Sequence, residues 1–270
     1  MNGILTLARH SVARSRVLLL VLTAVLAGFE ILLVVAAQTL QESGTFGSFA
    51  ALVPPFMRQV FGDSLIVFMS FAGVVCFGFF HPMVVAALAA FAIAVATEPV
   101  AEIESRFLDV VLARPIPRST VIGRSALLMT LLSAGVVAAM VAATLVGLHA
   151  LTPRTTAAPA TRLILSLAAN LWALLFSLGG LALAVGAASR RRSTAGGVVG
   201  VAALALFFVD YLARIWKPAA SMVWLSPFHY YDAMTMVMGR PLPAGHVAVL
   251  AGSGLAGVVL AFVLFSRRDL

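Results

Sequence analysis

The chain has 270 residues, of which 62% are hydrophobic and 10% are charged, and its mean hydropathy is +1.07. Soluble domains carry roughly 25% charged residues, so this composition excludes a soluble protein and indicates an integral membrane protein. The formal charge of +8 is expected to set membrane topology and to contact anionic lipid rather than nucleic acid. The single cysteine, Cys76, excludes an intrachain disulfide.

In residues 1–16, apolar side chains and arginines fall largely on opposite faces of a helix, as in an amphipathic helix. They are expected to lie in the cytoplasmic headgroup region, although a basic tail that only fixes orientation gives the same pattern. Residues 17–37 follow as the first span, because 21 apolar residues cross a hydrocarbon core of about 30 Å. This run is too long for the apolar region of a cleaved signal peptide, which is about 7–15 residues.

Glu30 lies inside this first span. A carboxylate within the membrane is costly, so it is expected to face protein or water rather than lipid. It either lines a pathway or serves as a neutral, hydrogen-bonded structural group.

Residues 38–64 form a glycine- and proline-containing loop in which 49–61 is expected to lie on the outer surface as a broken interfacial helix. The next apolar run, 65–97, is divided by His81 and Pro82, and proline breaks helices. We therefore expect a bent entry segment over 65–81 and a second span over 82–97, or else two short re-entrant pieces. His81 is interpreted as a kink or interfacial residue, because no second histidine or cysteine stands at metal-ligand spacing.

The longest polar interruption of the chain runs from Glu98 to Arg124. Ile103, Phe107, Val110 and Val111 recur at helical spacing, which predicts a short amphipathic helix that ends before Pro115. A charged helix between two spans suits docking to a soluble partner, and the alternative is a solvated loop with one helical turn. Glu98 and Glu102, four residues apart, are interpreted as a solvated helix face.

Four further spans are expected at 120–148, 162–188, 194–212 and 246–265. Asn170 lies in the fourth span, and three consecutive arginines, 190–192, mark a cytoplasmic turn before the fifth. Gly196 and Gly200 form a pair that permits close helix packing. Glycines at 252, 254 and 257 have the same role in the sixth span, and the outer loop 213–245 contains a possible short helix from Pro227.

The sequence thus predicts an all-α integral membrane protein with six transmembrane helices in one domain. Twelve basic residues fall on the expected inner side and six on the outer side, which places both termini and segment 98–119 in the cytoplasm. The two halves show no convincing repeat, so the signature of many secondary transporters is missing.

Catalytic and nucleotide-binding motifs are missing from the sequence. It contains no G-x-x-x-x-G-K-[ST], H-E-x-x-H or G-x-S-x-G pattern, and Lys217 is its only lysine. We expect a chain that is not an enzyme and that binds no metal or cofactor of its own.

Residues Glu102 to Arg118 read E-I-E-S-R-F-L-D-V-V-L-A-R-P-I-P-R, and the chain ends F-S-R-R-D-L. Together with the six-span layout, this resembles the permease subunits of type-2 ABC exporters. The corresponding family stretch, E-x-E-x-G-T-L-x-x-L-L-x-x-P-V-x-R, is a cytosolic coupling helix between the second and third spans. The chain departs from it at Ser105–Arg106, where the family has a small residue and glycine, followed by threonine.

The resemblance implies a half-transporter of a bacterial or archaeal cytoplasmic membrane, which pairs with a second copy of itself. Each copy docks a separate ATPase subunit that binds ATP and Mg²⁺. The residues assigned to ATPase docking are Glu98, Glu102, Glu104, Arg106, Phe107, Leu108, Asp109, Val111, Leu112 and Arg114. The candidate translocation path contains Glu30, His81 and Asn170.

Two other functions are compatible with the sequence. A self-sufficient secondary transporter or channel would use Glu30, His81 and Asp210 as its ionisable pathway. An intramembrane enzyme would use His81, His229 or Asp232, although no nucleophile–base spacing supports it. The substrate is not readable from the sequence, and neither is the choice between homodimer and heterodimer.

Overall fold

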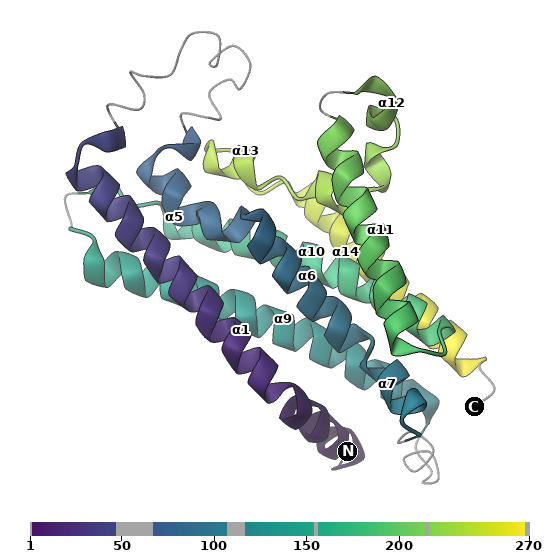
Figure 1. The fold of residues 1–270 in the computed structure, drawn as a ribbon. Coiled ribbons are helices and arrows are strands. Elements are labelled where there is room, and N and C mark those ends of the chain that lie inside the picture. The colour runs from purple at the N-terminus through teal and green to yellow at the C-terminus, as the bar shows by residue number, and fades with distance from the viewer. Residues whose placement is uncertain (1, 47–66, 107–116, 154–155, 214–215, 268–270) are drawn as a thin grey trace.

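The computed structural model describes residues 2–46, 67–106, 117–153, 156–213 and 216–267. Within these ranges every regular element is a helix and no strand occurs (Figure 1). Six helical stretches in this part of the chain are long and apolar enough to cross a membrane, which confirms an all-α multi-pass membrane protein. They are Arg16–Glu42, Phe71–Ala96, Ser119–Leu151, Thr161–Ala188, Arg192–Ala213 and Ala244–Ser266.

The first helix, α1 (Asn2–Glu42), is a single element of 41 residues. At 1.5 Å per residue it is about 60 Å long, roughly twice the thickness of a hydrocarbon core. The expected interfacial helix over 1–16 and the expected span over 17–37 are therefore parts of one continuous helix, not two separate elements.

The second crossing is divided where the sequence predicts a break. Helix α5 (Phe71–Phe80) ends at Phe80, and α6 (Pro82–Ala96) begins after His81, whose backbone is extended. The Nδ1 atom of His81 accepts a hydrogen bond from the Met83 amide at 3.2 Å. His81 therefore caps α6. Pro82 is the first residue of this helix, where a backbone amide would have no acceptor within the helix.

Helix α10 (Thr161–Ala188) lies at the centre of the bundle and packs against α6, α9 (Arg118–Leu151) and α14 (Ala244–Ser266). Its contact with α14 is a direct backbone approach, because a Cβ added at Gly180 would overlap the Gly254 carbonyl. Gly257 approaches the Gly180 backbone in the same way. The packing role predicted for Gly254 and Gly257 is confirmed, whereas Gly252 has no neighbour within 4 Å of its Cβ position.

The start of α1, the short helix α7 (Glu98–Glu104) and the end of α14 lie at one end of the bundle (Figure 1). At the opposite end, α11 (Arg192–Ala213) leads through α12 (Lys217–Ala220) and η1 (Val223–Leu225) to η2 (Pro227–Tyr230) and α13 (Ala233–Val237). The Tyr231 hydroxyl donates a hydrogen bond to the Phe79 carbonyl at 2.5 Å. The helix predicted from Pro227 is thus two short helical pieces, of which α13 packs against α5.

Candidate functional site

Helix α7 follows α6 after only one residue, Thr97. The Thr97 hydroxyl donates to the Ile93 carbonyl at 2.9 Å, so the last turn of α6 is closed by a side chain. Residues 98–102 are all buried. We call residues 98–119, which are predicted to bind a soluble partner, the docking segment. Its beginning is therefore packed into the bundle.

An ion pair joins α7 to the next membrane-spanning helix. A terminal nitrogen of Arg124 on α9 lies 2.7 Å from Glu102 Oε2, and the two side chains are 1% and 4% exposed, respectively. The prediction that Glu98 and Glu102 form a solvated helix face is wrong, because Glu98 is also buried. The pairing partner of Glu102 follows 22 residues later, beyond the reach of a helical-periodicity argument.

Two further contacts fix α7 to other helices. A Cβ placed at Gly186 on α10 would lie 3.2 Å from a methyl group of Val100. Glu104 Oε2 accepts a hydrogen bond from the Arg192 backbone amide, the first residue of α11, at 3.2 Å. Helix α7 therefore contacts α9, α10 and α11 while continuing directly from α6.

Arg106 ends this helical region in a left-handed conformation, with φ of +57°. Its amide donates to the Ile103 carbonyl at 3.0 Å, as in a helix terminus that usually carries glycine. The helical conformation that begins at Glu98 therefore ends at Glu104, within the segment predicted to be one amphipathic helix. The other predicted docking residues lie outside the described residues: Phe107, Leu108, Asp109, Val111, Leu112 and Arg114.

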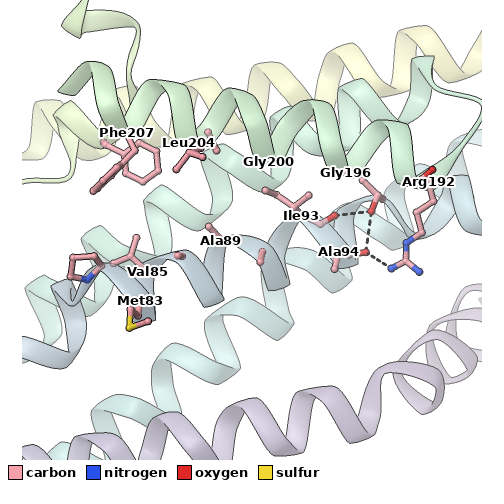
Figure 2. A pocket seen from close by; sticks show the side chains of 17 residues that line it. Met83, Val85, Ala89, Ile93, Ala94, Arg192, Gly196, Gly200, Leu204 and Phe207 are labelled. Atoms are coloured by element: carbon pink, nitrogen blue, oxygen red, sulfur yellow. Dashed lines mark hydrogen bonds between the residues drawn. The ribbon is translucent and has the colours of Figure 1, made fainter. Parts of the chain in front are cut away.

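A long apolar groove of about 920 Å³ lies between α6 and α11 (Figure 2). Gly196 and Gly200 line it, and neither has any atom within 4 Å of its Cβ position. Within the described part of this chain, no other helix packs closely against this glycine pair, and the glycines open space instead. The wall formed by α6 runs from Pro82 to Thr97, about 22 Å at 1.5 Å per residue.

The two ends of the groove differ in chemistry. Phe207 and Phe228 line one end, and Thr97, Arg192 and Ser193 line the other. The Arg192 side chain donates to the Ala94 carbonyl at 3.0 Å, as Figure 2 shows. The backbone amide of the same residue binds Glu104 on α7. Arg192 therefore belongs both to the groove and to the contacts that hold α7 in the bundle.

Glu30 is fully buried between α1, α5 and α9. Its Oε2 atom accepts a hydrogen bond from the Thr144 hydroxyl at 3.1 Å, and its Oε1 atom has no partner. The carboxyl group lies directly on Gly78, where an added Cβ would overlap Oε1. The Thr144 hydroxyl also lies 3.0 Å from the Met140 carbonyl, so its one proton serves two acceptors.

The other two predicted path residues lie elsewhere in the bundle. Asn170 is fully buried on α10, and neither of its amide atoms has a hydrogen-bond partner. His81 packs against the Phe29 ring, with centroids 5.6 Å apart. Neither residue lines the groove between α6 and α11, and neither does Glu30.

Three residues of the alternative hypotheses, Asp210, His229 and Asp232, lie near the C-terminal end of α11. His229 Nδ1 lies 3.8 Å from Asp210 Oδ1, and Asp232 caps α13 by accepting from the Thr235 amide. In the described ranges, no group of three or more histidine, cysteine, aspartate or glutamate side chains is placed to hold a metal ion.

Fold and site together define a multi-pass helical membrane protein. It has an apolar groove between α6 and α11 and, at one end of the bundle, a buried ion pair between Glu102 and Arg124. No protein-family model matches the chain, and no curated protein matches it.

Proposed function

We propose that this chain is the membrane permease subunit of an ATP-driven exporter of the type-2 ABC class. It works as one half of a homodimer in the cytoplasmic membrane, with both termini and segment 98–119 on the cytoplasmic side. ATP and Mg²⁺ bind to a separate ATPase subunit, one for each permease copy. The chain itself carries out no catalysis.

The observation that carries this proposal is the double role of Arg192. Its backbone amide is held by Glu104 of the docking segment, and its side chain lines the groove and binds Ala94 of α6. A displacement of the docking segment would therefore move Arg192. Through this residue it would act on α11 and on α6, the two walls of the groove. A transporter driven by a soluble motor requires a connection of this kind.

The backbone of Arg106 gives independent support for the family resemblance. Arg106 stands where the pattern E-x-E-x-G-T-L has glycine, and it adopts the left-handed conformation that favours glycine. A left-handed backbone at the position where the family pattern has glycine supports the proposed relationship.

In the proposed mechanism, each docking segment sits on its ATPase and moves when two ATPases close on ATP. The buried pair of Glu102 and Arg124 makes α7 and the start of α9 move together. Glu104 and Arg192 transmit the same movement to α11. The groove walls shift relative to each other, and the dimer changes between inward- and outward-facing states.

Purification from native membranes tests the proposal. A tagged chain is expected to elute with an equimolar P-loop ATPase and to hydrolyse ATP. Phe107→Ala combined with Leu108→Ala should abolish both, whereas the control pair Leu18→Ala and Leu20→Ala, at exposed positions of α1, should not. Transport by the chain alone in ATPase-free liposomes would show that the proposal is wrong.

Glu30 favours one second candidate, an ion-coupled transporter that needs no ATPase. A buried carboxyl group with one unpartnered oxygen can carry a proton within a membrane. With Glu30, His81 and Asp210 as the pathway, the purified chain should show proton-coupled flux that Glu30→Gln abolishes. Flux that requires an ATPase would eliminate this candidate.

A further inference from the structure

We propose that the groove between α6 and α11 binds an anionic membrane phospholipid. One acyl chain lies along the groove, and the headgroup lies at the arginine-rich turn that precedes α11. The site would exist whether or not the chain transports anything, so the inference does not rest on the function proposed above.

The shape of the groove suits an extended acyl chain. One wall runs from Pro82 on α6 to Thr97, which follows that helix, and the other runs from Arg192 to Phe207 on α11. Each covers 16 residues, a rise of about 22 Å. The chains of one leaflet reach through half of a hydrocarbon core, about 15 Å. A chain that enters from the polar end is therefore enclosed along its whole length.

The walls leave a space that needs an occupant. Where helices of this protein pack directly, as at Gly180 and Gly254, the glycine of one helix touches the backbone of the other. At Gly196 and Gly200 no atom approaches within 4 Å of the Cβ position. Because the surface is almost entirely apolar, water does not fill such a groove favourably, whereas a hydrocarbon chain does.

The positive charge at the polar end of the groove favours a lipid with an anionic headgroup. Arg190 and Arg191 are exposed, and Arg192 lines the groove end. The Glu104 carboxylate accepts a hydrogen bond from the Arg192 backbone amide, and three consecutive arginines stand at this end of the groove. Guanidinium groups bind phosphate through several donors at once, and basic clusters next to a span attract anionic headgroups.

Photolabelling of the full chain in nanodiscs, without ATPase or ATP, tests the proposal. The probe is phosphatidylglycerol with a photoreactive group on one acyl chain, compared with the same probe built on phosphatidylcholine. The expected label lies on peptides covering 82–97 and 192–207, with phosphatidylglycerol preferred. Without the ATPase, a negative result bears on lipid binding alone.

Glycine substitutions separate groove binding from general contact with lipid. Gly196→Leu with Gly200→Leu should fill the groove and remove the label. Gly197→Leu with Gly252→Leu is the matched control, because these glycines also have free space at their Cβ positions but do not line the groove. A thermal-unfolding measurement on each variant shows that the fold is retained.

Arginine substitutions test the headgroup. Arg191→Gln and Arg192→Gln should each reduce phosphatidylglycerol labelling by about fivefold. Arg162→Gln and Arg240→Gln, at exposed positions away from the groove, should leave it unchanged. Equal labelling by both lipids, undiminished labelling of the filled groove, or crosslinks from the groove to a second copy would each overturn the proposal.

Discussion

Glu102 and Arg124 form a buried ion pair, at 2.7 Å, across the base of the segment that joins two membrane-spanning helices. The pair brings together two residues that are 22 positions apart in the sequence. It joins α7 to α9 by a charged contact with almost no solvent exposure.

Separating this pair should destabilise the protein strongly. Glu102→Leu leaves the Arg124 guanidinium buried without its partner, which costs about 3–5 kcal/mol. The double variant Glu102→Leu with Arg124→Met should recover most of the loss. Unfolding in mixed micelles measures both, with Glu42→Gln at an exposed position as control; equal losses in the single and double variants would argue against the pair.

The left-handed backbone of Arg106 predicts that glycine is preferred there. Arg106→Gly should increase the unfolding free energy by about 0.5–1 kcal/mol, because the conformational cost of a side chain at φ +57° disappears. Gly239→Ala, at φ +91°, should have the opposite effect. If Arg106→Gly lowers stability in the same assay, the described end of α7 is incorrect.

The contact between Glu30 and Gly78 can be tested by a double-mutant cycle. Gly78→Ala should cost about 1–3 kcal/mol, because the new methyl group displaces the carboxyl group. In a Glu30→Ala background the same change should cost little. Gly135→Ala on α9, with nothing within 4 Å of its Cβ position, is the control. Additive effects at 30 and 78 would place the two residues apart.

The unpartnered amide of Asn170 predicts a gain in stability on its removal. Asn170→Leu should raise the unfolding free energy by about 1 kcal/mol, because a buried amide without hydrogen bonds is replaced by an apolar group of similar size. If Asn170 serves transport, the stabilised variant should also transport more slowly. A less stable variant would indicate that the amide does have partners.

Much of the fold follows from hydropathy and proline position. Six apolar segments are recognisable because each must be about 20 residues long, and the break at His81 follows from Pro82. The continuity of helix α1 was harder to predict from the sequence. An amphipathic segment and a membrane span are both helical, and no residue between them indicates whether the helix breaks.

The site was only partly predictable. The segment 98–119 stands out by its charge, yet the burial of Glu102 depends on Arg124, which folding brings back to it. Gly196 and Gly200 match a packing motif, but the neighbouring helix at these positions is too far away to use it. A pattern of small residues cannot distinguish a close contact from an open groove, because both need the same side chains.

The central claim is that movement of the docking segment changes the groove, and a distance across the groove tests it most directly. Spin labels at Ala90 on α6 and Leu204 on α11, with Cys76 replaced by alanine, report that distance by double electron–electron resonance in the proposed complex with an ATPase. We expect a shift on binding of ATP and Mg²⁺, and its loss in Glu104→Ala. An unchanged distance in a complex that hydrolyses ATP would contradict the account.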